Sequence, residues 1–89
     1  MFTNELKHAV YKINTANGSG TGFYLNEPNI ILTNYHVIEG NKKVALENQA
    51  KDRFIAHVLY VNPDVDIAFL RIENHIPKIS IPFNQVQTV

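Results

Sequence analysis

Short apolar runs separated by turn-forming residues constrain this chain more than any other feature of its sequence. The runs are rich in β-branched and aromatic residues and lie at 9–14, 22–26, 30–34, 43–47, 54–61 and 66–72. The segments between them are rich in Gly, Pro, Asn and Asp, which favour turns because they permit positive φ, preset φ or bond to their own backbone. Five or six strands with this spacing predict an all-β barrel or sandwich.

The N-terminal residues contain one long helical candidate. Residues 3–13 read TNELKHAVYKI, and Thr3 or Asn4 could cap a helix there. From Ala9 onward, however, the composition is that of a strand. We therefore keep residues 9–14 as the first predicted strand.

Length and composition are those of one small globular domain. Eighty-nine residues, of which 45% are hydrophobic, can bury a single core at the small end of the range. Eight basic residues balance eight acidic ones, and no apolar run approaches the roughly 20 residues of a membrane span, so neither nucleic acid nor a membrane is an expected partner. Without cysteine or a secretory signal pattern, the default expectation is a cytoplasmic location; a periplasmic or secreted one stays open if the natural chain begins earlier.

A histidine interrupts the strand pattern directly after the third predicted strand. The stretch NYHVIEG is too short for a strand and ends at Gly40, so we expect one helical turn that holds His36 at the barrel rim. Thirty residues later, Asp66 is expected to start the last strand, where its carboxylate would be held rigidly and partly out of water. Such a carboxylate fixes the tautomer of an imidazole and stabilises its protonated form. His36 and Asp66 are therefore a candidate base and orienting residue.

Three segments of the chain, taken in order, carry a resemblance to a known family. GSGTGFYL, IILTNYHVIEG and VNPDVDIAFLRI resemble the N-terminal half of a trypsin-like serine peptidase, closest to the bacterial HtrA/Deg-like branch. The resemblance implies a small antiparallel barrel of about six strands, one half of a two-barrel fold, over residues 1–74. Residues 75–89 would then begin the linker to a second barrel.

The same resemblance assigns roles to individual residues. It implies that His36 is the general base and Asp66 the residue that orients it, in the hydrolysis of a protein or peptide substrate without a cofactor. Gly20 and Gly22 would flank a strand packed close to the histidine. Tyr35 and Phe69 are bulkier than the common residues at their positions, without consequence for the two catalytic roles.

The family's nucleophilic serine has no counterpart that we can identify in this sequence. Its serine, oxyanion-hole amides and specificity pocket belong to the second barrel. The chain has two serines: Ser19 lacks a glycine at position 17, and Ser80 lies in what resembles the linker. We therefore expect the chain to be inactive in isolation, with its cleft face covered by a second barrel or by another chain, a second copy included.

Other readings of the same residues remain open. Asp64 is the rival carboxylate, which we interpret as turn chemistry within NPDV. A metal site is not expected, because the histidines show neither HxH nor HExxH spacing. We expect three of them to lie on the surface or to pack in the barrel: His8, His57 and His75. The alternative function is a non-catalytic, protease-derived barrel that binds a protein or assembles with itself, since a half barrel leaves apolar surface uncovered.

Overall fold

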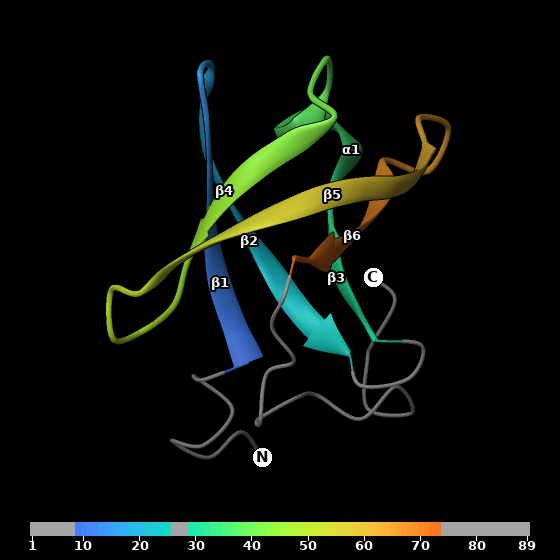
Figure 1. The fold of residues 1–89 in the computed structure, drawn as a ribbon. Coiled ribbons are helices and arrows are strands. Elements are labelled where there is room, and N and C mark those ends of the chain that lie inside the picture. The colour runs from blue at the N-terminus through green and yellow to red at the C-terminus, as the bar shows by residue number, and fades with distance from the viewer. Residues whose placement is uncertain (1–8, 26–28, 74–89) are drawn as a thin grey trace.

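The computed structural model describes residues 9–25 and 29–73, which form a closed β-barrel with one short helix (Figure 1). The elements in chain order are β1 (Val10–Thr15), β2 (Gly18–Leu25), β3 (Ile30–Thr33), α1 (Tyr35–Ile38), β4 (Lys43–Glu47), β5 (Arg53–Asn62) and β6 (Ile67–Ile72). Neighbouring strands are antiparallel and follow the order β1-β2-β3-β6-β5-β4, and β4 pairs with β1 to close the barrel. The predicted all-β barrel with a helical turn at the histidine is confirmed.

Several strand boundaries differ from the prediction by one residue or more, and two of these differences concern the candidate site. β2 begins at Gly18 rather than at residue 22, because Ser19 and Gly20 pair with Asn14 and Ile13 of β1 instead of forming a flexible turn. β6 begins at Ile67, so the expectation that Asp66 is the first residue of a strand is wrong. Asp66 instead ends the preceding turn with a positive φ of 57°.

Some predictions fall on residues that the structure does not describe. The proposed N-terminal helix would start within residues 1–8, and from Val10 onward the chain is strand β1. The boundary expected between residues 74 and 75 lies outside the described residues. Among those described, no helix is long and apolar enough to cross a membrane.

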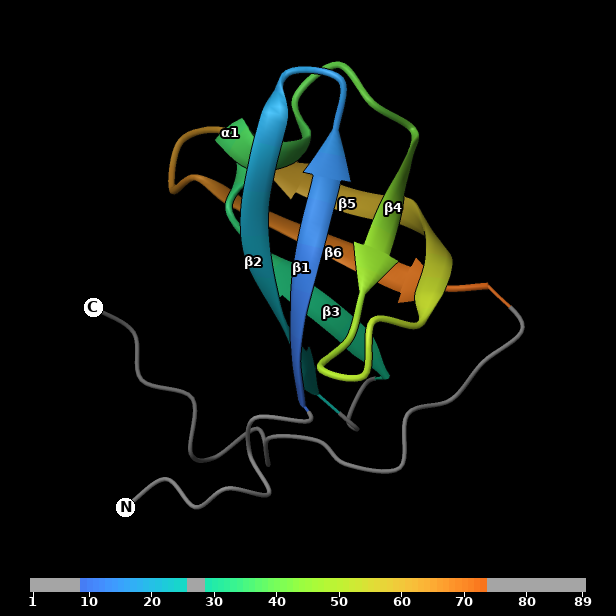
Figure 2. The same cartoon turned by 90° about the vertical axis from the view of Figure 1, so that its left-hand side faces the viewer.

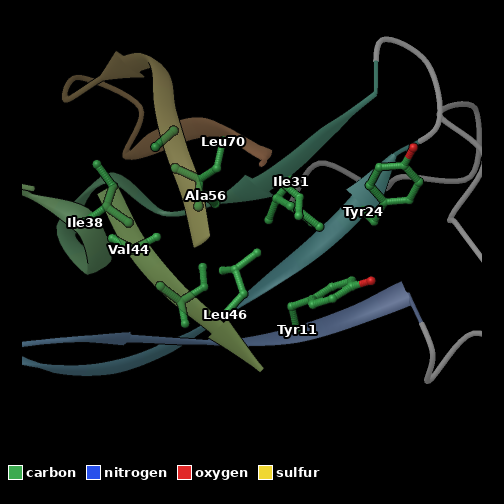
Figure 3. Close-up of a cluster of buried hydrophobic side chains, with 11 residues drawn as sticks. Tyr11, Tyr24, Ile31, Ile38, Val44, Leu46, Ala56 and Leu70 are labelled. Atoms are coloured by element: carbon green, nitrogen blue, oxygen red, sulfur yellow. The ribbon is translucent and has the colours of Figure 1, made fainter. Parts of the chain in front are cut away.

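The barrel interior is filled by side chains that alternate along the strands, as a sheet with one buried face requires (Figure 3). Eleven buried residues form this cluster: Tyr11, Ile13, Tyr24, Ile31, Ile38, Val44, Leu46, Ala56, Ala68, Leu70 and Ile72. Ile38 is the one member from α1, and it is 1% exposed. Burying a side chain of this size stabilises the fold by roughly 1.5–3 kcal/mol, so Ile38 anchors the helical turn to the barrel.

Two glycines of β2 permit close packing, Gly22 against β3 and β1 and Gly20 against α1. A Cβ on Gly22 would lie 2.5 Å from Cγ2 of Ile31, and a Cβ on Gly20 would lie 2.6 Å from both γ-methyl groups of Val37. Distances this short cannot be accommodated without a shift of the neighbouring side chains. The close approach of a glycine strand to the histidine segment, expected from the sequence, is therefore present at Gly20.

Candidate active site

The end of strand β3 leads into α1, which carries His36. Figure 2 shows α1 at one end of the barrel, beside the turn that joins β5 to β6. Thr33 is 5% exposed, and its Oγ1 donates a hydrogen bond to the main-chain oxygen of Thr21 at 2.8 Å. The chain stays extended at Asn34 and then enters α1, where the Val37 N–H donates to the Asn34 carbonyl at 3.2 Å. The main chain that leads to His36 is therefore held at the end of β3, although the His36 side chain is 69% exposed.

The turn between β5 and β6 is built by its own polar side chains. Asn62 Oδ1 accepts a hydrogen bond from the Asp64 N–H at 3.1 Å, and the Asp66 N–H donates to the Pro63 carbonyl at 3.3 Å. This closes the turn with Asp66 in the left-handed region, which aspartate tolerates better than most residues. The interpretation of Asp64 as a turn residue agrees with this geometry.

Asp66 contacts His36 with both of its carboxylate oxygens. Oδ1 accepts a hydrogen bond from the His36 main-chain N–H at 2.8 Å, and Oδ2 lies 2.6 Å from Nδ1 of the His36 ring. A carboxylate at this distance requires the proton on Nδ1, which leaves the lone pair on Nε2 able to accept another proton. The two residues predicted from the sequence are therefore brought together across thirty residues of chain.

Hydrogen bonding rather than burial determines the state of the Asp66 carboxylate. The His36 main-chain N–H, and then the His36 ring, hold the pKa of the Asp66 carboxyl below its ordinary value, against a smaller opposing effect of desolvation. The side chain keeps 42% of its surface exposed, so a carboxylate at neutral pH costs little desolvation energy. The result is a fixed negative charge against the ring of His36.

The remaining candidates from the sequence lie elsewhere. His57 is on β5, where its Nε2 lies 3.3 Å from Oε2 of Glu73. Ser19 is exposed on β2 opposite Asn14, whereas His8, His75 and Ser80 lie outside the described residues. Within the described ranges, no group of three His, Cys, Asp or Glu residues could hold a metal ion.

Asn34 is the residue that sequence reasoning left without a role. Its side-chain Nδ2 donates a hydrogen bond to the main-chain oxygen of Asp66 at 3.1 Å. An asparagine between a strand and a helical turn signals an N-cap, but an N-cap is expected to bond to its own helix. The partner thirty-two positions away could not be read from that signal.

A family model describes most of the chain. The trypsin-like peptidase domain model matches residues 20–88, which include His36 and Asp66. The chain is 36% identical to serine protease HTRA4 of Mus musculus over 55 residues, which is 62% of this chain and 11% of that protein. It is 34% identical over 59 residues to an uncharacterized protein of Sinorhizobium fredii, y4bJ, covering 66% of this chain and 9% of that protein. The chain thus spans about a tenth of the length of these curated relatives.

A solved structure extends the likeness to three dimensions. The inactive form of the Rv3671c protease superposes with a TM-score of 0.76 at 30% sequence identity. The alignment covers 94% of this chain and 41% of that one. The barrel as a whole, and not only its motifs, therefore matches part of a protease.

Proposed function

The chain belongs to the trypsin-like peptidase domain family, with relatives among the HtrA/Deg-like serine proteases, and from this premise we propose that it supplies the general base and its orienting carboxylate to a serine endopeptidase. His36 is the base and Asp66 the orienting residue. The observation that carries the proposal is the pair of contacts of 2.8 and 2.6 Å that Asp66 makes to the main chain and ring of His36.

The proposed reaction uses Nε2 of His36 first as a general base and then, protonated, as a general acid. A serine from another part of the enzyme attacks the carbonyl carbon of a peptide bond, and its hydroxyl proton passes to Nε2 of His36 as the new C–O bond forms. The imidazolium then returns that proton to the leaving amine as the C–N bond breaks. Asp66 remains ionised throughout, keeps Nδ1 protonated and stabilises the positive charge on the ring.

The nucleophile in this proposal comes from outside the described residues. Ser19 is exposed on β2 and pairs with Asn14 of β1, and the sequence around it is not the GNSGGP-type segment that supplies the oxyanion donors in this family. We propose that the 89-residue chain does not hydrolyse peptides by itself. The serine and the oxyanion donors would come from a second barrel or from another chain.

An apolar row on the outside of the barrel supports such a covering partner. Phe23, Leu32, Phe69 and Tyr60 stand directly opposite one another on β2, β3, β6 and β5. Phe23, Leu32 and Phe69 alternate with inward-facing residues of their strands, whereas a β-bulge between Val58 and Tyr60 brings Tyr60 into the row. The rings of Tyr60 and Phe69 are 5.1 Å apart. Phe23 and Tyr60 remain 39% and 48% exposed, and exposed apolar surface of this kind is commonly buried by association.

The test compares variants of the full-length gene product in a peptide-hydrolysis assay. Replacing His36 or Asp66 by alanine should lower kcat by about 10⁴-fold, as the loss of a triad member does. His57→Ala is the matched control, because it removes a histidine from β5 that is bonded to Glu73. Full activity of the His36 variant would refute the proposed role.

The apolar row also favours the alternative that this barrel is a non-catalytic association module. The two functions differ in what they require of His36, because a module needs the row but not the ring. A change at His36 that alters hydrolysis supports the enzyme, whereas one that alters only partner binding supports the module. A further test is independent of these variants: a serine-directed fluorophosphonate should not label the 89-residue chain alone, since we place the nucleophile elsewhere.

A further inference from the structure

Asn34 occupies the N-cap position of α1 without capping it. An N-cap asparagine normally accepts a hydrogen bond from the N–H of the second or third helical residue, here His36 or Val37. The Asn34 side chain makes no such bond. Because its partner is the main-chain carbonyl of Asp66, the amide nitrogen must face that oxygen, at 3.1 Å.

The capping role passes to Asp66. Its Oδ1 accepts the hydrogen bond from the His36 N–H, which is the second helical residue after the cap. Each of the two residues therefore serves the other's segment: the Asn34 amide holds the turn before β6, and the Asp66 carboxylate caps the helical turn after β3. We call this pair of bonds the Asn34–Asp66 exchange.

The exchange matters because the bonds within the turn act on main-chain N–H groups, whereas Asn34 bonds to the Asp66 carbonyl. The Asp66 N–H donates to the Pro63 carbonyl at 3.3 Å. Asp64 and Val65 are exposed, and Asp66 itself has a φ of 57°, in the left-handed region. A donor on the Asp66 carbonyl fixes the far side of the residue, and with it the direction in which the carboxylate leaves the backbone.

We propose that Asn34 is a positioning residue: its side-chain amide holds the Asp66 main chain so that both carboxylate oxygens bond to His36. If Asn34 instead capped α1 itself, it would compete for the His36 N–H and leave the carboxylate with the ring alone. The lowered pKa of the Asp66 carboxyl agrees with this arrangement, because the His36 N–H is its largest cause. The proposal rests on the proposed function only where it refers to catalysis.

The first measurement needs no variant. In the isotope-labelled 89-residue chain, NMR should detect scalar coupling between Nδ2 of Asn34 and the carbonyl carbon of Asp66, together with a strongly downfield resonance for the Nδ1 proton of His36. Absence of the coupling in the folded chain would show that the amide does not hold Asp66 and would overturn the proposal.

The second measurement uses Asn34→Ala, with Asn41→Ala as the matched control. Asn41 also bonds through its amide to the α1 segment, at Ile38 and Glu39, but it does not touch Asp66. In Asn34→Ala the Nδ1 proton should shift upfield or broaden, and the pKa of the Asp66 carboxyl should rise toward its ordinary value. Neither should change in Asn41→Ala.

Two outcomes of the variant experiment would overturn the proposal. One is a folded Asn34→Ala chain with unchanged Nδ1 and Asp66 signals. The other is a global loss of structure in Asn34→Ala beside a folded Asn41→Ala, which would make Asn34 a residue of general stability. In the full-length gene product, Asn34→Ala should lower kcat about five- to tenfold with KM nearly unchanged, as the loss of one hydrogen bond predicts.

The spectroscopic and kinetic arms separate the two proposals. If His36 is not catalytic, the Asn34→Ala spectra still change while hydrolysis does not. If Asn34 has no positioning role, the spectra stay constant even though His36→Ala abolishes hydrolysis. Failure of one proposal therefore leaves a different signature from failure of the other.

Discussion

Gly20 of β2 lies directly against Val37 of α1, so that a Cβ on the glycine would come within 2.6 Å of both valine γ-methyl groups. Val37 follows His36 in the sequence, and its side chain is stiff because it is branched at Cβ. The space that Gly20 leaves empty therefore sets how closely the histidine segment sits on the barrel. A side chain here would displace α1 rather than a flexible neighbour.

We predict that Gly20→Ala destabilises the fold by about 1–3 kcal/mol, the usual cost of overpacking, and lowers hydrolysis by the full-length gene product. Chemical denaturation and a peptide-hydrolysis assay measure the two effects. Gly20→Ala combined with Val37→Ala should recover part of both losses, because the clashing methyl groups are gone. Ser19→Ala, on the neighbouring exposed residue, is the control and should change neither quantity.

Asp66 should make the stability of the barrel depend on acid pH. The contacts to His36 lower the pKa of the Asp66 carboxyl in the folded state, so the folded protein binds this proton less readily than the unfolded chain does. The stabilisation is therefore present above the ordinary carboxyl pKa of about 3.9 and is lost as the pH falls through the folded-state pKa.

Asp66→Asn tests this sign. At pH 7 the variant should be less stable than the natural chain, and the difference should shrink as the pH falls below about 4, when the natural carboxylate is also neutral. Urea unfolding at a series of pH values gives the comparison. Asp64→Asn removes a carboxylate from the same turn without touching His36, and a loss of pH dependence in this control instead would contradict the assignment.

Thr33 should contribute to stability through one buried hydrogen bond. Its Oγ1 donates to the main-chain oxygen of Thr21 at 2.8 Å, where β3 gives way to the histidine segment. Thr33→Val keeps the shape but leaves the Thr21 carbonyl without this donor, at a cost of about 1–3 kcal/mol. Thr33→Ser keeps the hydroxyl and should cost clearly less in the same denaturation experiment; equal costs would point to packing instead.

Much of the fold could be predicted from the sequence because its determinants are local. The composition of runs such as 30–34 and 43–47 indicates strands, and the turn residues between β1 and β2 and between β4 and β5 indicate hairpins. The prediction fails where a local turn signal competes with the pairing of strands. Gly18 and Ser19 have turn composition, yet the hydrogen bonds offered by β1 draw them into β2.

The same distinction, between local determinants and contacts of distant segments, applies to the candidate site. The helical turn that carries His36 was predicted correctly, whereas Asp66 was predicted to start β6 and instead ends the preceding turn. Family resemblance supplied the proposed roles of both residues. The left-handed backbone of Asp66 comes from the closure of its turn and was not predicted. The bond of the Asn34 amide was not predicted either, because it depends on a contact between segments thirty-two residues apart. A residue's own neighbours in sequence carry no record of such a partner, so the mutual support of the two segments becomes visible only in the folded chain.

The outer apolar row predicts how the 89-residue chain behaves without a partner. Tyr60 is 48% exposed and stacks against Phe69, so two copies can bury these rings against each other, and the chain should self-associate. Its melting temperature should then rise with protein concentration, and sedimentation should show species larger than the monomer. Tyr60→Ser should weaken both effects, because it removes the most exposed ring of the row.

Val65→Ser is the matched control: Val65 is 58% exposed but lies in the turn, outside the row, so its loss should leave association unchanged. Equal effects of the two substitutions would mean that general surface hydrophobicity, and not this row, drives the association.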